Sequence, residues 1–116
     1  MIEEKYKQLC ETPSDINEHL PTINKYACLC NSIVELGVRG MVSTWALLAG
    51  YPWTVVSVDI VHPSEHKGNV EEVIEIAKKR GISWQFLQIS SLVSGRINII
   101  HLLYIRLLLL EKVKRG

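Results

Sequence analysis

The chain has 116 residues, of which 47% are hydrophobic and 22% charged, and its formal net charge is +1. This length corresponds to less than one average domain but is sufficient for one hydrophobic core. The composition excludes a disordered chain, a collagen-like repeat and a disulfide-dense mini-protein, and the charge balance does not indicate nucleic-acid binding. The chain has three cysteines, which is an odd number, and their spacing does not match a zinc-binding pattern. We therefore expect reduced thiols and a cytoplasmic location.

Residues 1–30 have a polar, helical pattern and form an expected N-terminal lead-in without a targeting signal. Ser14 and Asp15 are candidate caps for a short helix that ends near Leu20. Pro21 suits the start of another helix, which continues through Tyr26.

Strands and helices alternate from residue 31 onward. The apolar run 32–36, stopped by a glycine, and the β-branched run 54–60 predict two buried strands, and residues 84–88 predict a third. Between them, residues 41–49 have helical composition. Asn69 can cap a further helix, whose apolar residues recur at three- and four-residue spacing until Gly81.

Residues 97–110 are the most apolar stretch of the chain. They fall short of the roughly 20 apolar residues that a membrane-spanning helix needs, and they include His101 and Arg106. We therefore predict no membrane span, a fourth strand over 97–105 and an apolar, basic helix over 106–116. The expected organisation is a lead-in (1–30), a βαβ unit (31–105) and this atypical C-terminal helix.

Alternation of strands and helices with short connections is typical of parallel βαβ units with right-handed crossovers. Strands that are apolar throughout favour a sheet covered by helices on both faces. The predicted fold is therefore α/β and Rossmann-like, a three-layer αβα sandwich whose parallel sheet has the strand order 3-2-1-4.

The clearest candidate site is the turn between the first strand and the following helix. The strand ends near Glu35, and Gly37 and Gly40 allow close approach of a ligand to a helix start. Asp59 follows Glu35 by 24 residues, a spacing at which an acidic residue binds ribose hydroxyls in nucleotide-binding βαβ units. Two structural alternatives remain: the glycines only close a βα loop, and Asp59 only caps the loop at 62–63.

The turn also discriminates between ligand classes. A dinucleotide-binding loop has the pattern G-x-G-x-x-G, whereas residues 37–40 hold one glycine fewer. Glu35 beside the loop would repel a pyrophosphate and suits a ligand with an ammonium group. This chemistry favours S-adenosylmethionine over NAD.

Residues 33–40 resemble motif I of the class I S-adenosylmethionine-dependent methyltransferases, and residues 56–60 resemble the second-strand motif of that family. Residues 87–90 correspond to the end of its third strand, where the family often has an acidic residue and this chain has serine. The resemblance covers roughly residues 6–105. It implies S-adenosylmethionine as the cofactor, with its methionine end near Glu35 and Gly37 and the helix start near Gly40 and Ser43.

The resemblance also implies the remaining contacts. The acidic residue of the second strand would hold the ribose, its neighbour would flank the adenine, and the end of the third strand would face the adenine. These residues are, in order, Asp59, Ile60, Gln88, Ile89 and Ser90. It implies no metal, and no residue is assigned as a catalytic base.

The family form has seven strands, and the sequence departs from the family pattern after residue 105. We therefore expect a domain truncated after its fourth strand, by a shifted reading frame or a premature end. The predicted function is transfer of a methyl group to an unassigned acceptor. The alternatives are an inactive remnant that self-associates through the exposed edge of its fourth strand, and a nucleotide-binding Rossmann domain.

Histidines and tryptophans offer further candidates with plainer alternatives. His62 or His66 could act as a substrate-side base or a metal ligand, or both could be solvated loop residues. Trp45, Trp53 and Trp84 are more typical of core or rim packing than of stacking platforms, because no basic patch accompanies them.

Overall fold

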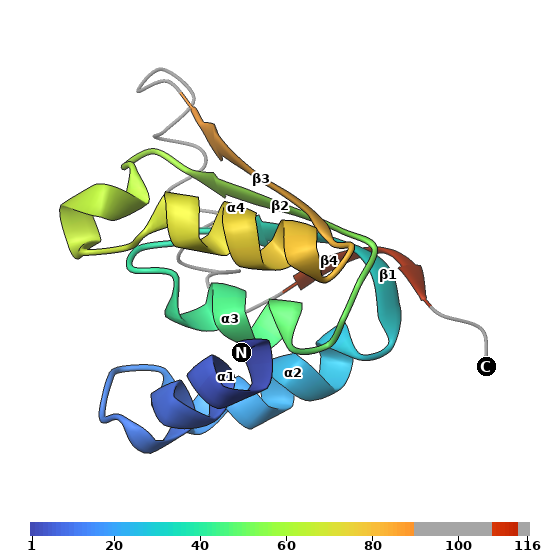
Figure 1. Cartoon of the computed structure of the whole chain (residues 1–116), viewed down its shortest axis with the longest axis horizontal. Helices are drawn as coiled ribbons and strands as arrows, with labels where there is room; N and C mark the ends of the chain where they lie inside the picture. Colours follow the sequence, from blue (N-terminus) through green and yellow to red (C-terminus); the bar gives the residue numbers. More distant parts are fainter. Residues whose placement is uncertain (90–107, 114–116) are drawn as a thin grey trace.

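The computed structural model describes residues 1–89 and 108–113 (Figure 1). The predicted strand over 97–105 and the site residue Ser90 lie outside these residues. The elements in chain order are α1 (Ile2–Glu11), the 3-10 turn η1 (Asn17–His19), α2 (Leu20–Ala27), β1 (Cys30–Leu36), α3 (Val42–Leu48), β2 (Thr54–Asp59), the 3-10 turn η2 (Pro63–His66), α4 (Val70–Lys79), β3 (Ser83–Gln88) and β4 (Leu108–Val113).

The fold is α/β, with three parallel strands side by side in the order β3-β2-β1. A fourth strand, β4, lies on the other side of β1 and pairs with it antiparallel. The prediction of a helix over 106–116 is thus wrong for residues 108–113, and the strand beside β1 is neither the predicted segment nor parallel. Pairing with β1 supplies the backbone N–H and C=O groups of this segment with hydrogen-bond partners in the sheet.

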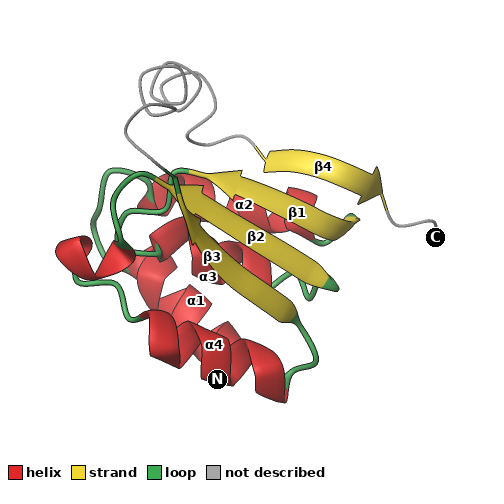
Figure 2. Ribbon diagram, turned by 90° about the horizontal axis from the view of Figure 1, so that it is seen from above, coloured by secondary structure: helices red, strands yellow, loops and turns green. Residues whose placement is uncertain are grey.

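The described helices all lie on one face of the sheet, so this part of the chain has two layers and not the predicted three (Figures 1 and 2). The reason lies in the two crossovers. The connections β1–α3–β2 and β2–α4–β3 step across the sheet in the same direction, and right-handed connections then bring both helices to the same face.

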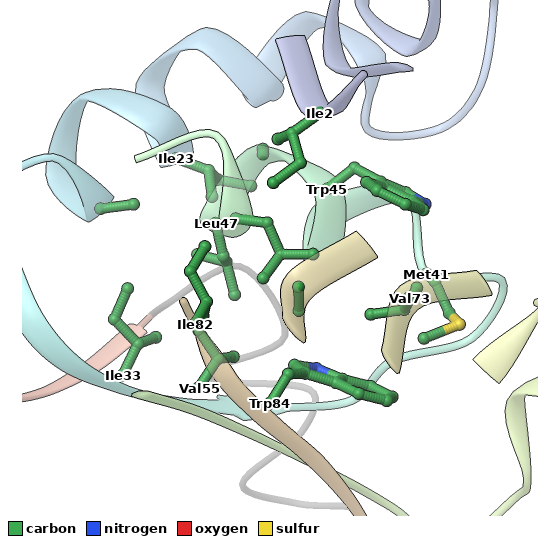
Figure 3. Packing of buried hydrophobic residues seen from close by; sticks show 14 of the residues in the cluster. Ile2, Ile23, Ile33, Met41, Trp45, Leu47, Val55, Val73, Ile82 and Trp84 are labelled. Carbon is green, nitrogen blue, oxygen red and sulfur yellow. The ribbon is translucent and has the colours of Figure 1, made fainter. Parts of the chain in front are cut away.

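The hydrophobic core fills the space between the sheet and these helices (Figure 3). Ile33, Val55 and Trp84 occupy neighbouring positions on the helix-facing side of β1, β2 and β3, and all three are buried. Trp45 on α3 is buried on the opposite side of the core, as predicted for core packing. Trp53 is 65% exposed and belongs to the rim.

Of the predicted helix caps, one is observed and two are not. Asn69 caps α4 as predicted, since its side-chain oxygen accepts a hydrogen bond from the backbone N–H of Glu72 at 3.0 Å. The predicted caps Ser14 and Asp15 are wrong, because η1 begins after Ile16 without a side-chain cap. Within the described residues, no helix combines the length and the apolar character needed to cross a membrane.

Candidate functional site

The turn from β1 into α3 is a tight loop that is hydrogen-bonded to the end of β2. Gly37 has φ of 88°, and its N–H donates to the carbonyl of Val58 at 2.8 Å. Arg39 and Met41 also have positive φ values, 49° and 72°. A Cβ atom on Gly40 would lie 2.8 Å from the carbonyl oxygen of His66, so Gly40 is required by packing against that neighbouring loop.

The Asp59 carboxylate anchors this loop. Its Oδ2 accepts hydrogen bonds from the backbone N–H groups of Val38 at 2.7 Å and Arg39 at 3.2 Å. Its Oδ1 accepts from Ile60 at 2.7 Å and Val61 at 3.3 Å. Four donors match the roughly four acceptor sites of an ionised carboxylate. Asp59 therefore joins the end of β2 to the glycine loop, in addition to capping the turn that follows it.

Glu35 lies beneath the loop at the centre of a buried polar cluster. Ser43 donates to Glu35 Oε2 at 2.6 Å, and Thr44 donates to Oε1 at 2.8 Å. Ser57, the β2 partner of Glu35 in the sheet, also donates to Oε1 at 2.8 Å. Ser57 in turn accepts a hydrogen bond from the indole N–H of Trp84 at 2.9 Å. The carboxylate is thus satisfied entirely from within the protein.

Burial and hydrogen bonding shift the two carboxyl groups in opposite directions. Burial raises the pKa of Glu35 above its ordinary value, and the three hydroxyl donors offset only part of that effect. Burial also acts to raise the pKa of Asp59, but the four backbone N–H groups outweigh it and lower the pKa. Asp59 is therefore the more firmly ionised of the pair.

A small cleft of about 60 Å³ opens on the outer side of the loop. It brings together three of the predicted site residues, Gly37, Gly40 and Ser43, with the lead-in segment at Asp15 and Ile16. Glu35 and Asp59 are not among its lining residues. Pockets that hold whole small-molecule ligands have volumes of about 300 Å³ or more, so the cleft has room for only one end of such a ligand.

An ion pair joins the two chain segments that line the cleft. Arg39 Nη1 lies 2.7 Å from Asp15 Oδ2, and both residues line the cleft. Sequence reasoning did not assign either side chain to the site, because 24 residues separate them and no local pattern links them. Ser57 was also missed, although a polar residue in an otherwise β-branched strand is a signal that could have found it.

The predicted adenine-facing residues lie together at the carboxyl ends of β2 and β3. The Gln88 side-chain N–H donates to the carbonyl of Ile60 at 3.0 Å, and the Ile89 N–H donates to the carbonyl of Asp59 at 3.0 Å. These contacts hold the two strand ends side by side. Ile60 and Gln88 do not line the cleft.

The histidine candidates are engaged in local structure. His62 Nδ1 accepts from the backbone N–H of Ser64 at 3.1 Å and lies 2.8 Å from the Ser64 hydroxyl. The ring packs edge-on against Phe86, with centroids 5.4 Å apart. His66 contributes the carbonyl beside Gly40. Over residues 1–89 and 108–113, no group of three potential metal-ligating side chains occurs.

Comparisons with family models, with curated proteins and with solved structures found no match to this chain.

Proposed function

We propose that this chain is a Rossmann-like, methyltransferase-type domain that binds S-adenosylmethionine at the carboxyl ends of its parallel strands. The observation that carries the proposal is the cleft along the Gly37–Ser43 turn, next to an acidic residue at the end of β2. In open α/β sheets, ligands bind outside the carboxyl ends of the strands. The motif resemblance supports the same edge of the sheet.

The hydrogen bonds of the loop support a cationic ligand over a phosphate. The Val38 and Arg39 N–H groups already donate to Asp59, and the Gly37 and Met41 N–H groups donate to backbone carbonyls. A pyrophosphate would find few free donors there and would meet the ionised Asp59 nearby. The sulfonium and ammonium groups of S-adenosylmethionine carry the opposite charge, which favours this cofactor over NAD.

Binding of the whole cofactor requires changes around the cleft. The cleft must widen, and the exposed side chains of Asp15 and Arg39 that line it would have to separate. For Asp59 to hold a ribose diol, the diol must replace the longer of its contacts, from Arg39 at 3.2 Å and Val61 at 3.3 Å. We therefore propose ribose binding at Asp59 with rearrangement of one loop N–H.

Methyl transfer from a sulfonium needs little activation by the protein, because the cofactor carries the reactive group. The role of the chain would be to orient the methyl group toward an acceptor. The acceptor stays unassigned, as does a catalytic base. A cytoplasmic location is part of the proposal and agrees with Cys10, Cys28 and Cys30 being thiols.

Isothermal titration calorimetry with S-adenosylhomocysteine, the demethylated product, tests the proposal directly. We expect saturable 1:1 binding of S-adenosylhomocysteine and no heat from NAD under the same conditions. Binding of NAD without S-adenosylhomocysteine would support the dinucleotide alternative, and the absence of both would overturn the proposed function.

A matched pair of glycine variants locates the binding. Gly37→Ala introduces a Cβ at a cleft-lining residue with φ of 88°, and we expect about tenfold weaker S-adenosylhomocysteine binding. Gly81→Ala is the control, because Gly81 has φ of 73° and open space around it beyond α4. Both variants should lose about 1–2 kcal/mol of stability. Equal affinities of the two variants would contradict binding at the loop.

A further inference from the structure

We propose that Asp15 and Arg39 form a clamp for the α-amino-acid group of the cofactor, in which the Arg39 guanidinium binds the carboxylate and Asp15 binds the ammonium. This inference rests on the proposed function and assigns the recognition of one end of the ligand. In the structure, the two side chains pair with each other at 2.7 Å, and both line the cleft. A zwitterion presents both complementary charges and can replace each partner of the pair.

The ion pair is suited to opening. The two side chains are 56% and 61% exposed, and exposed ion pairs contribute only about 0–1 kcal/mol to stability. Separation of the pair would also widen the cleft, because Asp15 belongs to the lead-in segment, Arg39 belongs to the loop, and both line the cleft. The same movement therefore creates the room and supplies the two charges.

The backbone of Arg39 is fixed although its side chain is exposed. Its φ of 49° belongs to the tight turn that begins at Gly37, and the N–H of the preceding Val38 donates to Asp59 at 2.7 Å. A guanidinium on a fixed backbone can bind a carboxylate with two parallel hydrogen bonds, whereas an ammonium acts only as a point charge. Arg39 is thus the residue that binds the carboxylate of the ligand.

Glu35, which the family resemblance assigns to the methionine end, does not reach the cleft. It is 3% exposed, and its two oxygens accept hydrogen bonds from Ser43, Thr44 and Ser57. Asp15 is the carboxylate that lines the cleft and is accessible to a ligand. Asp15 therefore takes the role of binding the ammonium group.

The pair of opposite charges also selects against a simple anion. Arg39 alone could bind a phosphate, but Asp15 lies within 2.7 Å of its guanidinium and would repel one. An α-amino acid carries its ammonium and carboxylate groups on the same carbon, so both residues can bind it at once. Inorganic phosphate is accordingly expected not to bind.

The test compares two ligands that differ only at this end. S-adenosylhomocysteine carries the α-amino-acid group, and 5′-methylthioadenosine has the same nucleoside and thioether without it. We expect calorimetry of the wild-type protein to give at least about tenfold tighter binding of S-adenosylhomocysteine. In Asp15→Asn and in Arg39→Gln, its affinity should fall toward that of 5′-methylthioadenosine because one of the two charged contacts is lost, and the affinity of 5′-methylthioadenosine itself should not change.

Two further variants distinguish a ligand-binding role of the Asp15–Arg39 pair from a role as an ion pair that only stabilises the loop. Lys79→Gln removes a charge from another exposed ion pair, with Glu75 at 3.3 Å on α4, and should bind both ligands as the wild type does. The double variant Asp15→Arg with Arg39→Asp restores an ion pair with reversed polarity. For a ligand that keeps its orientation, each charged group then meets a like charge, so S-adenosylhomocysteine should bind more weakly than to the wild type.

The outcomes distinguish the two proposals. Equal wild-type affinities for the two ligands, or wild-type affinity in the charge-reversed variant, would overturn the clamp and leave the proposed function standing. Binding of inorganic phosphate that is lost in Arg39→Gln would also overturn the clamp. Failure of both adenosine ligands to bind would overturn the proposed function and the clamp with it.

Discussion

The substitution Glu35→Ala should lower the free energy of unfolding by about 3 kcal/mol or more, measured by urea denaturation at pH 7. The three hydroxyls of Ser43, Thr44 and Ser57 converge on the carboxylate within 2.6–2.8 Å. Without it, they are left in a buried space, where each unsatisfied polar group costs about 1–3 kcal/mol. The lost side chain also leaves a cavity.

The control for this variant is Glu75→Ala. Glu75 is exposed on α4 and forms an exposed ion pair with Lys79, so its removal should change stability by about 0.5 kcal/mol or less. A loss in Glu35→Ala no larger than in this control would show that the hydroxyls find other partners, and would contradict the role of Glu35 as the centre of the cluster.

The contribution of Glu35 to the stability of the fold should decrease as the pH rises. The raised pKa of Glu35 means that the folded state holds this proton more tightly than the unfolded state, in which the pKa is near 4.5. The resulting stabilisation is complete below pH 4.5 and is lost as the pH rises through the raised value. In Glu35→Gln this loss should be absent, so the stability of the wild type relative to the variant should fall with rising pH.

The substitution Asp59→Ala should lower the free energy of unfolding by about 3 kcal/mol and abolish binding of S-adenosylhomocysteine. Four backbone N–H groups lose their acceptor, two from the glycine loop and two from the turn after β2. The loop that lines the cleft is then no longer tied to the sheet. Urea denaturation and calorimetry on the same protein measure the two effects.

Asp59→Asn is the conservative comparison. The amide keeps one acceptor oxygen but turns N–H groups toward two of the donors, so we expect a smaller loss of stability than in the alanine variant. Because the folded-state pKa of Asp59 is lowered, the stabilisation from its carboxylate is present above about pH 3.8 and is lost as the pH falls through the lowered value. If the stability of Asp59→Asn fell with decreasing pH by as much as that of the wild type, the lowered pKa of Asp59 would be contradicted.

The sequence was sufficient for elements whose signals are local. β1, β2, α4 and β3 were predicted within two residues of their observed bounds, because apolar runs, an asparagine cap and stop glycines determine them. The stretch over 108–113 was mispredicted because its strand form depends on pairing with β1, some 80 residues earlier in the chain. Apolar strands also could not indicate that the described helices cover only one face of the sheet.

Part of the candidate site could be predicted from local spacing, and part depends on contacts that form only in the folded chain. Glu35, Gly37 and Asp59 were singled out from spacing, and the structure brings them to the same end of the sheet. The partners of Asp59 were not predictable, because they are backbone groups of a loop whose conformation depends on Asp59 itself. The Asp15–Arg39 pair was not predictable either, because the lead-in returns to the loop only in the folded chain.

The buried cluster around Glu35 also gives the protein a natural optical probe. Trp84 donates to Ser57, Ser57 donates to Glu35, and Glu35 accepts from Ser43, which lines the cleft. Hydrogen bonds in such a chain polarise one another. The indole N–H of Trp84 is therefore linked through hydrogen bonds to Glu35 and Ser43. In a variant that keeps Trp84 as its one tryptophan, we expect the emission to change when Glu35 is protonated.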